Sequence, residues 1–327
     1  MIPLVSFLLI AVFSLLLIKA TDILIVNLKK LADATRLGEF AVTSFILALA
    51  TSLPELFVGI SAAIEGSPNL SLGNVIGSNI ADLSLVIGGA AIVGGSLSVQ
   101  GIFLTRDVFY AFLAGAAPML LLFDKNLSRI DGLILLALYG FYNVSVLSQR
   151  VGRIAEERGR EESILRKIIR RLNYGPSTWQ LQELGWIFFG AALLLFSSDM
   201  IVRSAIDLAS GLNLPLLLIG LFLVSAGTSL PELVFEIKAV KERKPSMVFG
   251  DLLGSIVANG TLVIGITSLI SPFQIRAFAD YLLATMVYVM IFALFYLFIR
   301  TKKKLERWEG FVLCLVFVFF LILEVIR

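Results

Sequence analysis

The sequence has no histidine and only one cysteine among its 327 residues. Without histidine, the chain lacks the commonest proton-relay side chain and the commonest ligand of transition metals. A single cysteine, Cys314, excludes an intrachain disulfide. Charged residues are also scarce, at 16%, where soluble domains average about a quarter. The low charge excludes an ordinary soluble domain.

Hydrophobic residues, by contrast, make up 58% of the chain, and the mean hydropathy is +0.94. Apolar stretches of about 20 residues recur, long enough to cross a hydrocarbon core of about 30 Å. The composition therefore predicts an all-α polytopic membrane protein that is embedded in the lipid bilayer. The net charge of +3 reflects the placement of charged residues in the loops and does not indicate nucleic-acid binding.

The apolar runs predict ten transmembrane helices in two groups of five. We expect them at roughly 2–27, 39–64, 71–97, 107–124, 130–149, 182–209, 214–240, 246–271, 277–299 and 308–326. The predicted organisation is a first five-helix repeat at 1–149, a basic loop at 150–181 and a second five-helix repeat at 182–327. The loop carries eight basic residues against four glutamates. Two interpretations are open for it: an amphipathic helix on the anionic leaflet, or a solvated linker helix.

The distribution of lysine and arginine orients the spans. With the N-terminus outside, 21 of the 27 basic residues fall on the inner side and five on the outer side. The positive-inside rule then places both termini outside the cell and the central loop in the cytoplasm. Because five is odd, the second half must enter the membrane with the opposite polarity to the first.

A segment that occurs twice is the strongest signal in the chain. Residues 50–88 and 227–265 align without a gap at a constant offset of 177, and 18 of the 39 paired positions are identical. Similar halves of opposite polarity form an inverted-topology repeat, which is typical of secondary transporters with a site near the membrane midplane. A cation channel could share this design.

Each copy places Thr-Ser-Leu-Pro-Glu inside an apolar run. Pro54 and Pro231 lack an N–H and free helix carbonyls near Thr51 and Thr228. The acids Glu55 and Glu232 follow directly, and Ser52 and Ser229 add hydroxyl oxygens. In lipid, such a break is tolerated where it is buried in protein or lines a wet cavity. A structural kink with a snorkelling acid would explain one copy, but it explains two matching copies poorly.

The next span in each half carries a triplet of polar residues at intervals of four, which places each triplet along one helix face. The triplets are Asn74, Ser78 and Asp82 in the first half and Asp251, Ser255 and Asn259 in the second. The two halves together offer carboxylate, carbonyl, hydroxyl and amide oxygens. All-oxygen ligation with paired acids suits Ca²⁺, and the same oxygens suit Na⁺.

These motifs, ATSLPE with GNVIGSNIAD and GTSLPE with GDLLGSIVAN, resemble the two repeats of the Ca²⁺:cation antiporter superfamily, most closely its prokaryotic sodium/calcium exchangers. The resemblance implies an antiporter and no enzyme. It implies transported Ca²⁺ and Na⁺, no cofactor and no obligate protein partner, with electrogenic exchange and alternating access by sliding of spans one and six.

The resemblance also implies a set of ion ligands. Glu55 and Glu232 would bind Ca²⁺ with the carbonyls of Thr51 and Thr228. Flanking Na⁺ sites would use the remaining serines and main-chain oxygens, namely Ser52, Ser78, Ser229, Ser255, Ala48 and Ser225.

Two features depart from the family pattern. The central pair, Asp82 and Asn259, is exchanged between the halves, and Asp251 replaces an asparagine. The extra acid keeps two alternatives open, an H⁺/Ca²⁺ antiporter and a K⁺-dependent exchanger.

Overall fold

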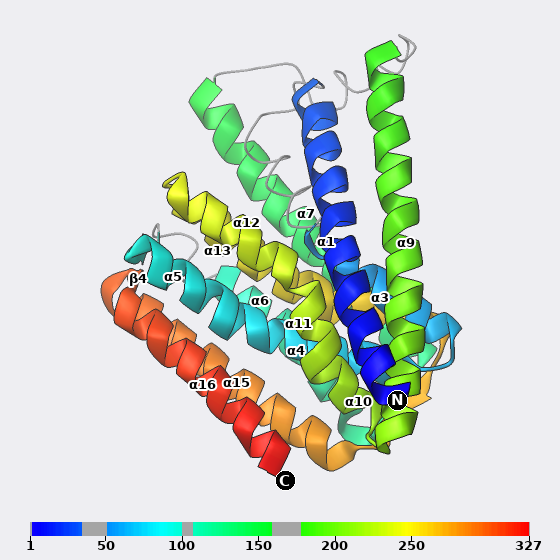
Figure 1. Ribbon diagram of the computed structural model, residues 1–327. Coiled ribbons are helices and arrows are strands. Elements are labelled where there is room, and N and C mark those ends of the chain that lie inside the picture. The colour runs from blue at the N-terminus through cyan, green and yellow to red at the C-terminus, as the bar shows by residue number, and fades with distance from the viewer. Residues whose placement is uncertain (1, 35–50, 100–106, 159–177, 327) are drawn as a thin grey trace.

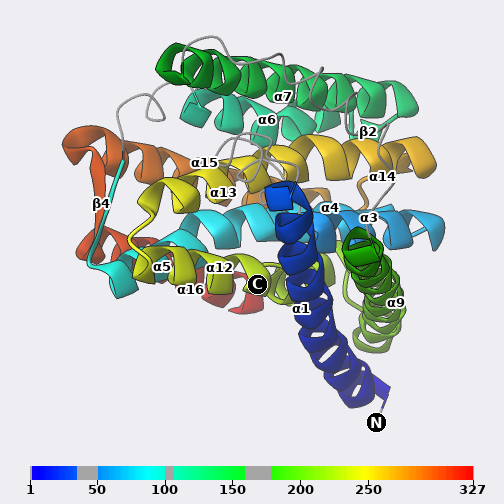
Figure 2. The ribbon, with the colours of Figure 1, turned by 90° about the horizontal axis from the view of Figure 1, so that it is seen from above.

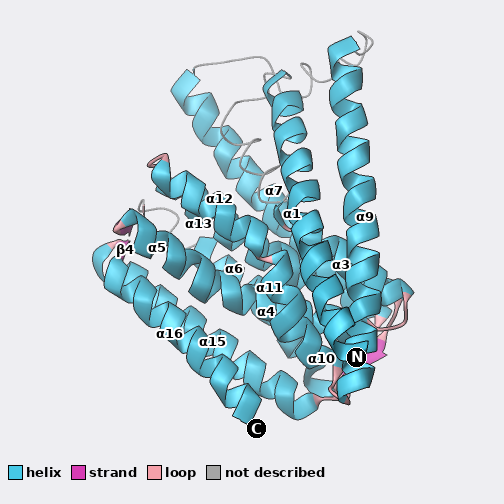
Figure 3. Ribbon diagram, viewed as in Figure 1, coloured by secondary structure: helices cyan, strands magenta, loops and turns pink. Residues whose placement is uncertain are grey.

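The computed structural model of the protein describes residues 2–34, 51–99, 107–158 and 178–326, almost all of them helical (Figure 3). The helical elements of the first half are α1 (Ile2–Ala34), α3 (Leu53–Ile64), α4 (Pro68–Ala81), the π-helical η1 (Asp82–Val86), α5 (Ile87–Gly94), α6 (Val108–Leu121), the 3-10 turn η3 (Leu122–Asp124) and α7 (Arg129–Arg158). Those of the second half are α9 (Thr178–Leu212), α10 (Leu216–Leu218), the π-helical η4 (Ile219–Val224), α11 (Ser225–Thr228), α12 (Leu230–Lys241), α13 (Pro245–Val257), the π-helical η5 (Ala258–Val263), α14 (Ile264–Ile270), α15 (Phe278–Lys302) and α16 (Arg307–Ile326).

In the described part of the chain, these elements join into ten helical segments that correspond to the ten predicted spans. Residues 39–50 of the predicted second span lie outside the described residues. Within the described ranges, six segments are long and apolar enough to cross a membrane, and α3 and α6 with η3 are shorter apolar helices. The segments α7 and α16 complete the set. The helix α7 runs to Arg158, nine residues past its predicted end, while most of the predicted central loop lies outside the described residues.

The chain ends share one end of the molecule. The N-terminus, the C-terminus and the region of α10 lie together, whereas the end of α7, the start of α9 and the turn between α12 and α13 lie at the opposite end (Figure 1). Each half therefore crosses the structure an odd number of times, and the two halves run in opposite directions.

The helices α1 and α9 pack along each other and stand at one edge of the molecule (Figure 2). One third of the residues in their apolar parts are buried, against 83% in the segment formed by α4, η1 and α5. Their outward side chains, such as Phe7, Phe188 and Phe196, are exposed large hydrophobics. The bilayer, rather than protein, is the natural environment of these surfaces.

Short strands join the two halves, a feature that the sequence did not predict. Strand β1 (Ser96–Ser98) pairs antiparallel with β4 (Lys304–Glu306), and β2 (Asn126–Leu127) pairs antiparallel with β3 (Phe273–Gln274). In both sheets, one strand follows the third span of one half and the other lies between the fourth and fifth spans of the other half. Each sheet therefore pairs a strand of one half with a strand of the other, and the two sheets lie at opposite ends of the molecule.

The helix α4 approaches α10 and η4 so closely that main-chain atoms come into contact. A methyl group at Gly73 would lie 2.0 Å from the carbonyl oxygen of Leu217, and one at Gly77 would lie 2.1 Å from that of Leu221. Only glycine fits at these two positions, because any side chain would meet main-chain atoms. Small residues that allow such close contact are typical of packed transmembrane helices.

Candidate ion-binding site

The two Thr-Ser-Leu-Pro-Glu motifs have the same local structure. The helix is interrupted at Ser52 and at Ser229, whose φ and ψ are −82° and 2° in one case and −84° and 0° in the other. The proline then occupies the start of α3 or α12, where its missing N–H is tolerated. Each glutamate lies in the first turn of its new helix, where the positive end of the helix dipole favours negative charge.

The predicted site residues within the described ranges are buried without exception. Glu55 is 1% exposed and Glu232 is 3% exposed. The other buried members are Thr51, Ser52, Asn74, Ser78, Asp82, Ser225, Thr228, Ser229, Asp251, Ser255 and Asn259. Ala48 lies outside the described residues.

Two hydrogen bonds cross between the repeats and are equivalent under the 177-residue offset. Thr51 Oγ1 donates to Asp251 Oδ1 at 2.9 Å. Thr228 Oγ1 donates to Asn74 Oδ1 at 3.1 Å. Each threonine of a broken helix therefore contacts the first triplet residue of the opposite half. The sequence indicated that these four residues lie on equivalent elements of the two halves. It did not predict that each threonine contacts the opposite half.

A second pair of contacts obeys the same relation. Ser78 Oγ and Thr228 Oγ1 lie 3.1 Å apart, and Thr51 Oγ1 and Ser255 Oγ lie 3.5 Å apart, both within hydrogen-bond distance. The network reaches an acid directly, because Ser78 Oγ also donates to Glu55 Oε1 at 3.3 Å. Hydroxyl, amide and carboxylate oxygens therefore meet in two groups, each with residues of both halves. One group joins Thr51 to Asp251 and Ser255, and the other joins Thr228 to Asn74, Ser78 and Glu55.

The network loses its symmetry near the central pair. Asn259 Nδ2 donates to Oδ1 of Asn79, a buried residue that the sequence analysis did not select. The position equivalent to Asn79 in the second repeat is Ile256, so a search for matched polar residues passes over it. Ser229 lies close to Asp82, although neither Ser229 Oγ nor Asp82 Oδ1 reaches hydrogen-bond geometry with any group.

Both triplets end at a π-helical turn, η1 at Asp82 and η5 around Asn259. The hydroxyls of Ser84 and Thr261, again 177 residues apart, donate to the carbonyls of Ile80 and Val257. Such bonds to the carbonyl four residues back compete with the regular helix ladder. π-Helical turns within α-helices are frequent at functional sites.

Five buried carboxyl groups lie in this region, one more than the sequence analysis selected. Glu232 interacts electrostatically with Glu55, Asp82 and Asp251. The additional acid is Glu236, which is 1% exposed and interacts with Asp251 and Asp82. Its spacing of four from Glu232 on an apolar helix was a signal available in the sequence. Within the described ranges, no three acidic side chains converge closely enough to hold a single metal ion.

Several oxygens of these acids have no hydrogen-bond donor. The buried atoms Glu55 Oε2, Glu232 Oε2, Asp82 Oδ1 and Asp251 Oδ2 lack a partner. Leaving a buried carboxylate oxygen unpaired is costly. The arrangement is therefore better suited to holding cations than to stabilising an empty protein core.

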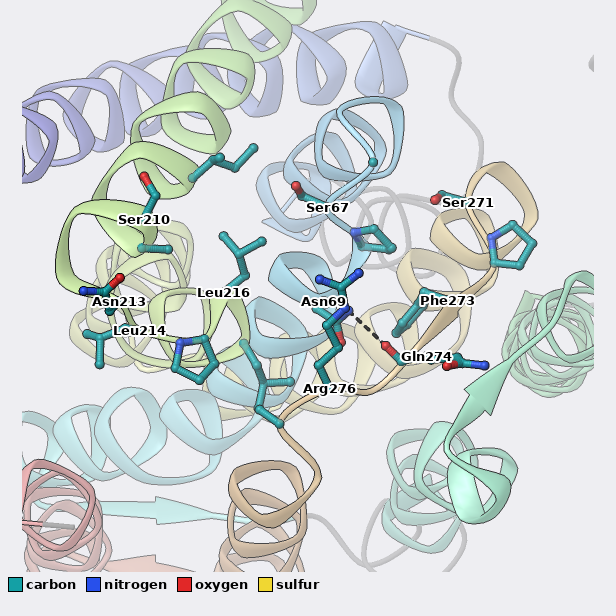
Figure 4. A pocket seen from close by; sticks show the side chains of 18 residues that line it. Ser67, Asn69, Ser210, Asn213, Leu214, Leu216, Ser271, Phe273, Gln274 and Arg276 are labelled. Carbon is teal, nitrogen blue, oxygen red and sulfur yellow. Dashed lines mark hydrogen bonds between the residues drawn. The ribbon is translucent and has the colours of Figure 1, made fainter.

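A cavity of about 660 Å³ (Figure 4) lies beside α10, at the end of the molecule that holds both termini (Figure 1). It lies between the start of α4, the α9–α10 turn and the segment after α14. Asn69 lines it and donates from Nδ2 to the Gln274 carbonyl at 3.1 Å, and Arg276 lies beside them. Asn69 precedes Asn74 by five residues, about 7.5 Å along a helix axis. The cavity thus approaches the buried network from this end.

Inverted halves, paired breaks in the helices and a buried oxygen network define a polytopic membrane transport protein. The chain belongs to the sodium/calcium exchanger family, whose model matches residues 5–147 and 183–325. This match and the solved structures below confirm the predicted fold class, ten spans in two inverted repeats, and the resemblance to prokaryotic exchangers. The protein is thus a transporter of the Ca²⁺:cation antiporter superfamily.

Two curated relatives are similar over most of the chain. The sodium/calcium exchanger MaX1 of Methanosarcina acetivorans is 26% identical, covering 97% of this chain and 98% of its own. The inner membrane protein YrbG of Escherichia coli is 31% identical, covering 76% of this chain and 75% of its own.

Among solved structures, the sodium-calcium exchanger NCX_Mj soaked with zero Na⁺ and Ca²⁺ has a TM-score of 0.61 and 25% identity. It covers 100% of this chain and 99% of its own. The same exchanger soaked with 10 mM Na⁺ and zero Ca²⁺ has a TM-score of 0.62 and 26% identity, with 97% of each chain covered.

Proposed function

We propose that the protein exchanges Ca²⁺ for Na⁺ across a cell membrane by alternating access. The observation that carries this proposal is the pair of buried glutamates, Glu55 and Glu232, which come from the two inverted repeats and interact electrostatically, with Glu55 hydrogen-bonded to Ser78. Two carboxylates balance one divalent ion. Six to eight oxygens of this kind satisfy Ca²⁺, which tolerates irregular geometry.

Within this proposal, Glu55 and Glu232 bind Ca²⁺ together with the main-chain carbonyls of Thr51 and Thr228. The flanking Na⁺ sites use Ser52, Ser78, Ser229, Ser255 and the main-chain oxygens of Ala48 and Ser225. Asn74, Asp82, Asp251 and Asn259 line the site. The acids repel one another when no cation is present. The transporter therefore changes between its two access states only when the site holds either Ca²⁺ or Na⁺. This requirement is the physical origin of obligatory exchange.

The moving part in this mechanism is the pair α1 and α9, which slides along the remaining eight spans. Their position supports the idea, because they pack along each other at the edge of the molecule and bury little of their surface. At Gly227, in the broken helix, a methyl group would lie 2.2 Å from Ser14 Oγ of α1. A displacement of α1 therefore changes the wall of the ion site directly.

The proposed topology follows the basic residues. Both termini lie outside, and the central loop at 150–181 lies in the cytoplasm between repeats at 1–149 and 182–327. The α12–α13 turn, with Lys241 and Lys244, then faces the cytoplasm, and the cavity beside Asn69 faces outward. We further propose that more than two Na⁺ ions exchange for each Ca²⁺, so that transport is electrogenic.

The experiment that tests the proposal is Ca²⁺ uptake into proteoliposomes driven by an outward Na⁺ gradient at equal pH on both sides. We expect uptake to require the Na⁺ gradient and to respond to an imposed membrane potential. Uptake that ignores Na⁺ and follows a pH gradient would establish H⁺/Ca²⁺ antiport instead. That second candidate is favoured by one observation, the buried acids Asp82 and Asp251 beside the two glutamates.

A further inference from the structure

The second repeat contains a buried acid for which the first repeat has no equivalent. Glu236 lies in α12, one turn beyond Glu232, and is 1% exposed. The residue 177 positions earlier is Gly59. A Cβ at Gly59 would lie 2.8 Å from Val263 Cγ1 and 3.0 Å from the hydroxyls of Ser71 and Thr267. The first repeat therefore has no room for a side chain at this position.

Glu236 has no described partner of opposite charge. Its Oε2 atom is buried without a hydrogen bond, and the same is true of Oδ2 of Asp251, with which Glu236 interacts electrostatically. The other oxygen of Asp251 accepts a hydrogen bond from Thr51. Two acids that are more than nine-tenths buried thus each keep an oxygen free in the same region, and burying a carboxylate without a counter-charge costs several kcal/mol or more.

The helix packing places Glu236 away from the lipid. On α12, Leu233 contacts Gly89 and Val240 contacts Gly94, both in α5. Glu236 lies between these two contacts on the helix, and α12 also packs against η1, which begins at Asp82, and against α13, which carries Asp251. Along α12, it lies about 6 Å from Glu232 on the side of the basic α12–α13 turn.

The number of buried charges indicates what this position holds. Five carboxyl groups interact here, and one Ca²⁺ balances two of them. Within the described ranges, no three acids converge on one point, so the acids are distributed along the site rather than gathered in one cage. A position with two acids and mostly apolar helix contacts suits a cation of lower charge than Ca²⁺, which takes six to eight oxygens.

We propose that Glu236 and Asp251 form an additional subsite for a monovalent alkali cation, beside the Glu55–Glu232 centre and on the side of the α12–α13 turn. The inference rests on the proposed exchange of Ca²⁺ for Na⁺ and adds an ion position to it. In this proposal the two halves differ in function, because the subsite uses Glu236 of the second repeat and the equivalent residue of the first repeat is Gly59.

The test compares Glu236→Gln with the wild type in two assays on proteoliposomes. In Ca²⁺/Ca²⁺ exchange without Na⁺, the variant should still carry Ca²⁺, which shows that it folds. In Na⁺-driven Ca²⁺ uptake, the Na⁺ concentration for half-maximal rate should rise about tenfold, the effect of losing one charge-assisted contact, and the Na⁺ dependence should become less steep. Isothermal titration of the Ca²⁺-free protein with NaCl should detect fewer bound Na⁺ ions.

A parallel titration with KCl at constant Na⁺ identifies the cation. If K⁺ occupies the subsite, K⁺ stimulates the wild type, and Glu236→Gln abolishes the stimulation. The matched control is Glu242→Gln, at the exposed end of the same helix, which should leave both curves unchanged. Glu236→Gly, which copies the first repeat, should behave as Glu236→Gln does.

The outcomes separate this inference from the proposed function. If the wild type shows no coupling of Ca²⁺ to Na⁺, the proposed function fails. If the wild type is coupled and Glu236→Gln has unchanged Na⁺ and K⁺ curves, the subsite is rejected alone, and Glu236 is then a protonated structural residue. If Glu236→Gln lacks Ca²⁺/Ca²⁺ exchange, Glu236→Asp replaces it, and an unchanged cation dependence of that variant also rejects the subsite.

Discussion

The two halves of the molecule break their helices in the same way, yet they differ in packing and in charge. Thr51 and Thr228 make equivalent contacts across the repeat interface. By contrast, a methyl group at Gly73 would meet the Leu217 backbone, whereas one at Gly250, its equivalent, would meet nothing within 4 Å. The second half also carries Glu236 where the first has Gly59. The common contacts lie within the candidate site, and the differences mark where the halves have diverged.

The largest expected effect comes from removing either mirrored glutamate. Glu55→Gln and Glu232→Gln should each reduce Ca²⁺ uptake by about 100-fold or more, because losing one partner of a buried charge interaction costs about 3–5 kcal/mol. The measurement is the initial rate of Na⁺-driven Ca²⁺ uptake in proteoliposomes at equal protein density.

The chain offers a matched control for this pair. Glu65 and Glu242 are repeat equivalents at the ends of α3 and α12, where they pair with Arg203 and Lys244. Glu65→Gln and Glu242→Gln should keep near wild-type rates. Near wild-type exchange by Glu55→Gln or Glu232→Gln would remove the altered residue from the Ca²⁺ site.

The glycine pair tests the difference in packing. Gly73→Ala should lower stability by about 1–3 kcal/mol, since the added methyl group overpacks a backbone contact. Gly250→Ala should be neutral or stabilise by up to about 1 kcal/mol, because alanine favours the helix and the space is open. Thermal unfolding of the purified proteins in detergent measures both, and equal losses of stability would contradict the packing difference.

The threonine pair tests the common contacts. Thr51→Ala and Thr228→Ala should each weaken exchange by about threefold to tenfold, the value of one or two buried hydrogen bonds. Thr51→Ser and Thr228→Ser keep the hydroxyl and should restore most of the activity. A difference of more than about tenfold between the two alanine variants would show that the symmetric contacts are not functionally equivalent.

The smallest effect is expected at the central pair. Asp82→Asn should reduce exchange less than either glutamate variant, because Asp82 is not one of the two acids assigned to Ca²⁺. The informative measurement is the pH dependence of Ca²⁺ uptake. A shift of that dependence in Asp82→Asn would indicate proton involvement, and an identical profile would argue against proton coupling through this residue.

Sequence reasoning selected the candidate-site residues that occur in matched pairs, and the structure places those within its described ranges in the protein interior. The Thr-Ser-Leu-Pro-Glu motifs and both polar triplets were visible because duplication makes polar residues in apolar runs improbable as accidents. Asn79 and Glu236 were missed for the same reason, since their equivalents are Ile256 and Gly59. The cross-paired strands were missed as well, because segments of two or three residues carry no periodicity that predicts a partner.

The sequence by itself determined the membrane class, the ten spans, their opposed polarity and the identity of the paired acids, because hydropathy, charge bias and duplication are properties of the chain read in order. Only the tertiary structure decided which half each threonine contacts, how closely α4 approaches η4, and that Glu236 is buried in protein rather than exposed to lipid. Those features depend on the relative placement of helices far apart in sequence, which side-chain volume and backbone contact fix and periodicity does not.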